Sequence, residues 1–206
     1  MFHRESTRIV YWPFALPGAM CASADQWLRH NLDLLDIDYH LDTWQTLSDH
    51  DPVELDSDRV DLLLVGGGNT FRLLDQVRQH GFVDQVRRFC LDGGDYYGGS
   101  AGAVLACETI EIADGHDPNE PGLDDLAALG LITGTAVLPH FTEDQLEAAG
   151  RWASSHGTVV LGLPESVGLR CDEGIATVRG KGQLTRLSDH SVERFTAGSR
   201  FDLPTL

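Results

Sequence analysis

The segment Gly98-Gly99-Ser100-Ala101-Gly102 has the composition of a turn that holds a catalytic nucleophile. It fits the pattern Gly-x-Ser-x-Gly, in which a serine projects from a sharp turn between a strand and a helix. Small residues on both sides relieve the crowding of such a turn. The amide of Ala101, at the start of the following helix, is then placed to bind an oxyanion. Glycine-rich turns with an idle serine are equally common, so the pattern alone leaves both interpretations open.

A general base for this serine is expected at His140, which follows the short apolar run Ala136-Val137-Leu138 and Pro139. Functional residues of an α/β sheet gather at the carboxyl ends of its strands, so His140 should lie at the same sheet edge as Ser100. Imidazole titrates in the range needed to take a proton from serine and return it. No pair of histidines has a helical metal-ligand spacing with a carboxylate, so neither a metal nor a cofactor is predicted.

A third group should orient the histidine, and the polar loop over residues 111–122 offers candidates. Asp114, Asp117 and Glu120 lie between Ser100 and His140, and the order serine, acid, histidine is one of the known triad orders. The alternative is a solvated acidic turn, which must hold for most of these carboxylates in any case.

The run Gly66-Gly67-Gly68-Asn69-Thr70-Phe71 follows an apolar segment and opens a helical one. It lacks the third glycine of a dinucleotide-binding loop and the lysine of a phosphate-binding loop, which weakens a nucleotide site. The glycine amides could instead supply the second half of an oxyanion hole beside Ser100. Ordinary turn chemistry is the third interpretation.

The elements that position these residues alternate between strands and helices along the chain. Apolar runs predict strands over residues 9–12, 60–65, 95–99, 136–138 and 158–163, and short strands with glycine turns from Ser166 onward. Helical periodicity predicts helices over residues 22–35, 70–89, 101–106 and 142–155, with an interruption at Gly81 and with Trp27, Leu28, Leu32 and Leu35 near one face. Such alternation predicts an α/β fold with a largely parallel sheet and helices on both faces.

Three of these motifs together resemble the peptidase E (aspartyl dipeptidase) family of serine peptidases. The motifs are Gly66 to Phe71, Gly99-Ser100-Ala101-Gly102-Ala103 and Pro139-His140-Phe141, in that order and with similar spacing. Thr109-Ile110 and Gly162-Leu163-Pro164-Glu165 also fit, so the resemblance extends over roughly residues 9–180.

The resemblance implies a three-layer α/β/α sandwich of the class I glutamine amidotransferase type, formed by residues 1–206 as one domain. It implies a nucleophile at Ser100, a general base at His140, and an oxyanion and substrate-binding region formed by Gly67, Gly68, Asn69 and Ala101. Family members cleave short peptides, typically dipeptides after an N-terminal aspartate, and related branches cleave other acidic or β-linked peptides such as cyanophycin. An amidotransferase would have cysteine at position 100.

The chain departs from the family pattern where the triad acid is expected. The best-known members carry Asn-Asp-Met-Pro after the nucleophile helix, whereas this chain has the stretch from Ala113 to Glu120. Asp117 is the favoured third member, and Glu120 and Asp114 stay open. A second hypothesis is therefore a non-catalytic fold relative that binds an acidic metabolite or a partner.

Composition limits the partners of this 206-residue chain. Fifteen Lys and Arg against 32 Asp and Glu give a formal net charge of −17, which argues against a nucleic-acid surface. There is no apolar run of membrane-spanning length, and Met1–Glu5 do not begin a signal peptide, so a cytoplasmic location is expected. The expected partner is a small peptide, with no nucleic acid and no membrane, and a homodimer is left open.

Charge and cysteine placement add two expectations. Residues 111–125 contain six acids and no base. If the substrate is acidic, local arginines or backbone amides must overcome the negative field of the chain. The four cysteines, Cys21, Cys90, Cys107 and Cys171, show no Cys-x-x-Cys spacing and are expected to be reduced and buried.

Overall fold

The computed structural model describes residues 6–189 and 191–204. The segment Met1–Glu5, from which the lack of a signal peptide was predicted, lies outside these residues. Over the part of the chain that is described, no helix is both long enough and apolar enough to cross a membrane.

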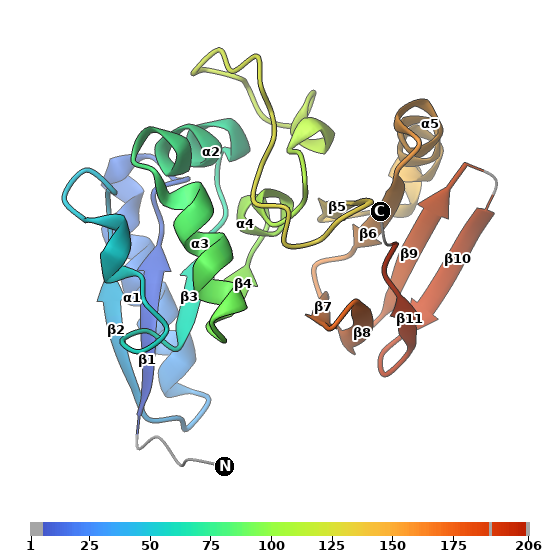
Figure 1. Ribbon diagram of the computed structural model, residues 1–206. Coiled ribbons are helices and arrows are strands. Elements are labelled where there is room, and N and C mark those ends of the chain that lie inside the picture. The colour runs from blue at the N-terminus through green and yellow to red at the C-terminus, as the bar shows by residue number, and fades with distance from the viewer. Residues whose placement is uncertain (1–5, 190, 205–206) are drawn as a thin grey trace.

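The N-terminal half contains a four-stranded parallel sheet in the order β2-β1-β3-β4 (Figure 1). Helices on both faces connect the strands, as parallel pairing requires. The elements are β1 (Thr7–Trp12), α1 (Gly18–Asp33), β2 (Tyr39–Thr43), η1 (Pro52–Glu54), β3 (Leu62–Val65), α2 (Thr70–Gln79), α3 (Phe82–Leu91) and β4 (Asp95–Gly98).

Alternation along β1 divides the core into two layers, because successive side chains of a strand point to opposite faces. Ile9 and Tyr11 pack in one cluster with Leu28 and Leu32 of α1. Val10 and Trp12 pack in the larger cluster on the other face, which includes residues of α2 and α3 (Phe71, Leu74, Phe82, Val86). This larger cluster continues into the C-terminal half through Leu138 and Val160, so the two halves share one apolar core.

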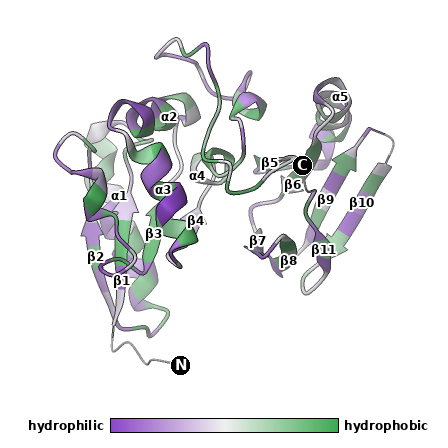
Figure 2. Ribbon diagram, in the orientation of Figure 1, coloured by the Kyte–Doolittle hydropathy of each residue, from purple (hydrophilic) through white to green (hydrophobic). Residues whose placement is uncertain are grey.

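The C-terminal half adds a mixed sheet in the order β10-β9-β6-β5 and a small antiparallel sheet in the order β11-β8-β7. Within the former, β5 and β6 are parallel, and β9 pairs antiparallel with both β6 and β10. Hydrophobic and hydrophilic residues are interspersed along β9 and β10 (Figure 2). β9 buries Leu184, Thr185 and Leu187, whereas β10 is exposed apart from the half-buried Phe195. The elements are α4 (Ala101–Leu105), η2 (Glu111–Ala113), β5 (Thr135–Pro139), η3 (Glu143–Gln145), α5 (Leu146–His156), β6 (Val159–Leu163), β7 (Val167–Asp172), β8 (Ile175–Gly180), β9 (Gln183–Ser188), β10 (Ser191–Thr196) and β11 (Arg200–Asp202).

The predicted strands and helices are confirmed in type, and the differences have local causes. The largely parallel sheet is confirmed only for β1–β4 and for the pair β5–β6; among the described residues the strands form three separate hydrogen-bonded sheets. Gly81 separates α2 from α3 with a left-handed φ of 74°. The edge strand β2 was not predicted, because its sequence Tyr-His-Leu-Asp-Thr buries one side chain, Leu41.

Two burial predictions were wrong. Trp27 and Leu35 were predicted near one face with Leu28 and Leu32, yet they are 65% and 64% exposed, whereas Leu28 and Leu32 are buried. Trp27 is one residue out of register with the buried stripe, and Leu35 lies beyond the end of α1. All four cysteines are free, but Cys90 is half-buried and Cys171 is exposed.

Glycines allow β3, β4 and α4 to approach closely beneath the serine. A Cβ atom on Gly102 would overlap the carbonyl oxygen of Val65, and one on Gly98 would overlap that of Gly102. The hydroxyl of Tyr96 donates a 2.7 Å hydrogen bond to the same Gly102 carbonyl. The first turn of α4 therefore lies directly against the end of β3.

We expect Gly102→Ala to lower the free energy of unfolding by about 1–3 kcal/mol, because the new methyl group forces backbone apart in a packed region. Gly99→Ala is the matched control, since its Cβ would meet no atom closer than 3.8 Å. Chemical denaturation of both variants checks this. Equal stability of the two would contradict the packing argument.

Candidate active site

Ser100 lies at the turn between β4 and α4. Its φ of 50° and ψ of −113° differ from those of both elements, and the turn projects its side chain at the carboxyl edge of the parallel sheet. This is the geometry that the Gly-x-Ser-x-Gly pattern predicts. The neighbouring glycine run is close, because a Cβ on Gly67 would lie 3.0 Å from the Cβ of Ser100.

The parallel pair β5 and β6 places a histidine and a glutamate side by side. Pro139, the last residue of β5, is in register with Leu163, the last residue of β6. His140 therefore leaves the sheet next to Pro164 and Glu165. The amide of Phe141 donates a 3.0 Å hydrogen bond to the Leu163 carbonyl, which ties the two strand ends together. The Phe141 ring lies over Gly162, where a Cβ would come within 2.6 Å of it. His140 itself has a φ of 55°.

Ser100, His140 and Glu165 form a continuous hydrogen-bonded row. The His140 Nε2 atom lies 2.8 Å from the Ser100 Oγ atom, and the His140 Nδ1 atom contacts Glu165 Oε2. With Nδ1–H donating to the carboxylate, Nε2 is left as the acceptor for the serine hydroxyl. The side chains of His140 and Glu165 are 58% and 81% exposed, so the row is open to solvent. The arrangement can activate a serine as a nucleophile.

Two backbone amides in the turns around Ser100, those of Gly68 and Ala101, have no hydrogen-bond acceptor among the described residues. Gly68 has a φ of 139°, and a Cβ there would overlap the Ala15 backbone, so glycine is required at this position. The amide of the next residue, Asn69, donates to the Ala15 carbonyl at 2.9 Å, which holds the glycine loop against the end of β1.

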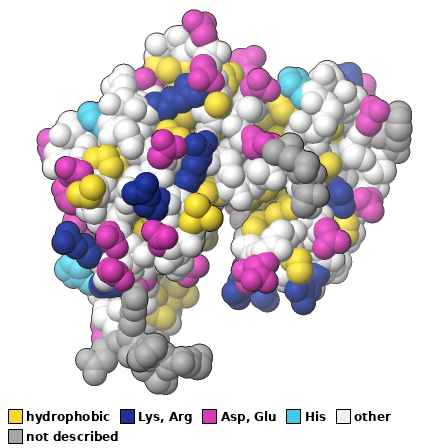
Figure 3. Space-filling view, in the orientation of Figure 1, with side chains coloured by type: hydrophobic (Ala, Val, Ile, Leu, Met, Phe, Trp, Pro, Cys, Tyr) yellow, Lys and Arg dark blue, Asp and Glu magenta, His cyan; other side chains and the backbone are white. Residues whose placement is uncertain are grey.

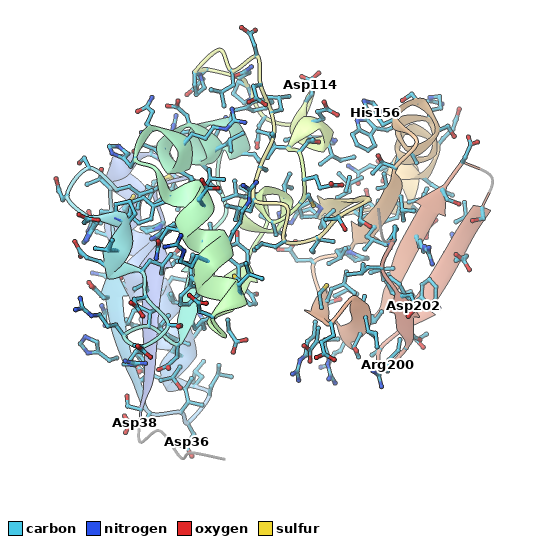
Figure 4. All side chains as sticks on the ribbon, viewed as in Figure 1. Asp36, Asp38, Asp114, His156, Arg200 and Asp202 are labelled. Carbon is cyan, nitrogen blue, oxygen red and sulfur yellow. The ribbon has the colours of Figure 1, made fainter. Side chains whose placement is uncertain are left out.

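The structure does not bring the predicted triad acids to His140. Asp117 Oδ2 accepts hydrogen bonds from the Thr70 amide at 2.8 Å and the Thr70 hydroxyl at 2.6 Å. Glu120 forms an ion pair with Arg72 at 2.7 Å. Asp114 is exposed on the outer surface of the loop (Figure 4). Asp117 and Glu120 instead bind the N-terminal turn of α2, where the helix dipole favours negative charge.

This loop holds the start of α2 at several points. As the N-cap of the helix, the Asn69 side-chain oxygen accepts a 2.8 Å hydrogen bond from the Arg72 backbone amide. The Asn69 side-chain nitrogen donates a 2.8 Å hydrogen bond to the Pro118 carbonyl. Because Asn69 directly follows Gly68, these bonds also limit the movement of the Gly68 amide. Asn69 was predicted as an oxyanion or substrate-binding residue, and the structure places it at the N-cap of α2; Thr70 was not predicted.

We expect Asp117→Ala to lower the free energy of unfolding by about 1–2 kcal/mol, the range of a lost helix N-terminal acceptor. The reason is that the amide and the buried hydroxyl of Thr70 lose their shared acceptor. Asp114→Ala removes an exposed carboxylate from the same loop and should change stability by less than about 0.5 kcal/mol. Thermal and urea denaturation compare the two. Equal destabilisation would contradict the role assigned to Asp117.

The cysteines are poor candidates for a nucleophile. Burial raises the pKa of Cys107 to about 12 and that of Cys90 to about 11, so both are thiols rather than thiolates near neutral pH. Over residues 6–189 and 191–204, no group of three His, Cys, Asp or Glu side chains is placed to hold a metal ion.

Glu165 is the site residue that sequence reasoning missed, although a signal for it existed. It lies two residues past a predicted strand, in a stretch that already matched the family motifs. The argument that placed His140 at the carboxyl edge of the sheet applies equally to Glu165. What was not known was that β5 and β6 are neighbours.

The fold and this row of side chains define a class: an α/β protein with a Ser-His-Glu arrangement of the serine-hydrolase type. The model of peptidase family S51 matches residues 1–179, and the chain belongs to that family. It is 34% identical over 142 residues to a peptidase E of Citrobacter koseri, and 34% identical over 136 residues to that of Salmonella typhi. These matches cover 63% and 60% of this chain, and 59% and 57% of the relatives' own lengths.

Solved structures support the same fold. A peptidase from an acI-B1 Actinobacterium superposes with a TM-score of 0.71 at 19% identity, over 95% of this chain and 83% of that one. A putative peptidase E protein from Listeria monocytogenes EGD-e superposes with a TM-score of 0.63 at 17% identity, over 96% of this chain and 90% of that one.

Proposed function

We propose that this protein is a serine peptidase that hydrolyses short peptides through Ser100, His140 and Glu165. The observation that carries the proposal is the hydrogen-bonded row from the Ser100 hydroxyl through both ring nitrogens of His140 to the Glu165 carboxylate. Membership of peptidase family S51 supplies the class of bond that is cleaved.

In the proposed reaction, the Ser100 Oγ atom attacks the scissile carbonyl while His140 Nε2 takes the hydroxyl proton. Glu165 stabilises the resulting imidazolium and keeps the ring in the productive orientation. The amides of Gly68 and Ala101 donate to the oxyanion of the tetrahedral intermediate, and each such donor is typically worth about 3 kcal/mol. His140 then returns the proton to the leaving amine, which produces an acyl-enzyme.

Water completes the cycle by attacking the acyl-enzyme, with His140 again taking the proton and Ser100 leaving as its hydroxyl. The exposure of His140 and Glu165 gives water direct access to this step. The loop of Asp117 and Glu120 has a positioning role, because it holds the turn that presents the Gly68 amide.

For the substrate, we propose dipeptides with an N-terminal aspartate, on the resemblance of the three motifs to aspartyl dipeptidases. On the same ground we propose that the chain forms one domain of the class I glutamine amidotransferase-like α/β/α type. The shared apolar core of the two halves supports the single domain.

The test is hydrolysis of a panel of Asp-X, Glu-X and isoaspartyl dipeptides by the purified chain, together with covalent labelling by a fluorophosphonate. Cleavage of Asp-X dipeptides and a label on Ser100 are expected. A chain that neither cleaves any of the panel nor takes the label would refute the peptidase proposal, whereas cleavage of Glu-X or isoaspartyl dipeptides alone would refute the specificity.

A further inference from the structure

The small sheet β11-β8-β7 carries a cluster of cations on a strongly acidic chain. Dark blue side chains gather over the end of the molecule where β7, β8 and β11 lie, and Arg200 is among the side chains at that end (Figures 3 and 4). The members of this basic face are Arg170, Arg179, Lys181 and Arg200, all of them exposed. Lys181 is the chain's single lysine.

The strand register explains why these arginines share one face. Arg170, Thr177 and Arg200 lie opposite one another on β7, β8 and β11, and Arg179 follows two residues after Thr177. The intervening residues Leu169, Val178 and Phe201 point to the other face, where they pack in an apolar cluster. Since side chains alternate along a strand, the arginines must project to solvent.

This basic face begins at the proposed active site. The Lys181 amide donates a 2.8 Å hydrogen bond to the carbonyl of Ser166, the residue after Glu165. Arg179 is opposite Gly168, two residues further, and Arg170 is four residues from Ser166. A strand rises about 3.3 Å per residue, so the cations extend along the sheet from a position next to Ser166 to one roughly 13 Å away from it.

Most of these cations are unpaired. Over the described residues, Arg59, Arg88, Arg179, Lys181 and Arg200 have no carboxylate within ion-pair distance, and three of these five belong to the basic face. Arg170 has Asp172 at 3.7 Å, with both side chains about 70% exposed. Asp172, Glu173 and Asp202 lie at the end of the sheet away from Ser166, so positive charge is concentrated on the side nearer the site.

We propose that the basic face binds the acidic C-terminal tail of a peptide substrate whose scissile bond lies at Ser100. The inference rests on the proposed peptidase function and extends its substrates beyond dipeptides, to longer peptides with Asp or Glu in the segment after the cleaved bond. An extended chain spans at most about 3.5 Å per residue, so tail residues from about the second to the fifth reach the cations. The exposed triad leaves the site open for such a tail.

This placement also explains how a chain with a net charge of −17 would accept an anionic peptide. Long-range repulsion is screened over about 10 Å at 0.1 M salt, whereas contacts with an adjacent guanidinium persist. The unpaired cations therefore dominate the interaction at short range.

The test compares Asp-Ala-Glu-Glu-Glu with Asp-Ala-Gln-Gln-Gln in the wild-type chain and in the double variant Arg179→Gln/Lys181→Gln. Exposed charge pairs of this kind are each worth a factor of about two to five. The wild-type chain should therefore cleave the acidic peptide with a kcat/KM about fivefold higher or more. The ratio should fall several-fold in the double variant, which keeps Arg170 and Arg200, and towards one in the wild-type chain at about 0.5 M salt.

The matched control is Arg59→Gln/Arg88→Gln, which removes the same number of unpaired charges from outside the basic face and should keep the wild-type ratio. Cleavage of both peptides with no preference in the wild-type chain would overturn the tail proposal and leave the peptidase proposal standing. So would an equal loss of preference in the control.

If neither pentapeptide is cleaved, the peptidase proposal is decided by the dipeptide panel and the tail proposal is decided by binding. Fluorescence anisotropy with labelled Asp-Ala-Glu-Glu-Glu and the Ser100→Ala variant should then show binding weakened at least fivefold by Arg179→Gln/Lys181→Gln. Unchanged binding, or equal affinity for the glutamine peptide, would overturn the tail proposal.

Discussion

Replacement of Ser100 by alanine should reduce kcat for Asp-X dipeptides by a factor of about 10⁴ to 10⁶, the loss typical of removing a serine nucleophile. The change removes the Oγ atom that lies 2.8 Å from His140 Nε2 and leaves no other group to form the acyl-enzyme. Progress curves at high enzyme concentration, together with loss of fluorophosphonate labelling, measure the effect.

The fold should survive this substitution, because the Ser100 side chain has no hydrogen-bond partner other than His140 among the described residues. Circular dichroism and the melting temperature provide the control. Full activity in a correctly folded Ser100→Ala variant would exclude Ser100 as the nucleophile.

Replacement of Glu165 by glutamine should lower kcat by about 10² to 10³ at neutral pH. Loss of a buried triad acid reduces the rate by roughly 10⁴, and the effect here should be smaller because Glu165 is 81% exposed and solvent screens its charge. The amide can still hydrogen bond to His140, so the loss reports the charge and the tautomer of the ring rather than its packing.

Asp117→Asn and Glu120→Gln are the informative comparisons, since both carboxylates were candidates for the same role. Asp117 and Glu120 bind Thr70 and Arg72 respectively, so these variants should lose less than about tenfold in kcat. Measurement of kcat and KM separately for all three variants decides the assignment. A loss at Asp117 that exceeds the loss at Glu165 would reverse it.

The contrast between Glu165 and Asp117 shows which parts of the site are readable from sequence. Ser100, Gly68 and Ala101 belong to local turns, whose geometry follows from the glycines beside them. The proposed triad acid depends instead on which strand is adjacent to β5, and strand order is a property of long-range pairing. The known order serine, acid, histidine favoured an acid between Ser100 and His140. The parallel pairing of β5 with β6 instead places Glu165, which follows His140 in the sequence, beside the His140 ring.

For the fold, too, local elements were predictable from the sequence, whereas the pairing of distant strands was not. Apolar runs and glycine breaks predicted the central strands and the division between α2 and α3. Trp27 shows the limit of such patterns. It is apolar, as a buried helical residue is expected to be, but it lies one position from the buried stripe and its side chain is exposed. The separation of the strands into three sheets follows from hydrogen bonding between distant segments, which no local pattern encodes.

The backbone at the two central residues has a consequence for the evolution of this protein. Ser100 and His140 both have φ values near 50°, a region that disfavours residues with a side chain and typically costs about 1–3 kcal/mol each. Glycine at either position would relieve that strain while removing the reactive group. Selection for thermal stability alone would therefore drive these two positions towards glycine, and serine and histidine persist there only while the chemistry itself is under selection.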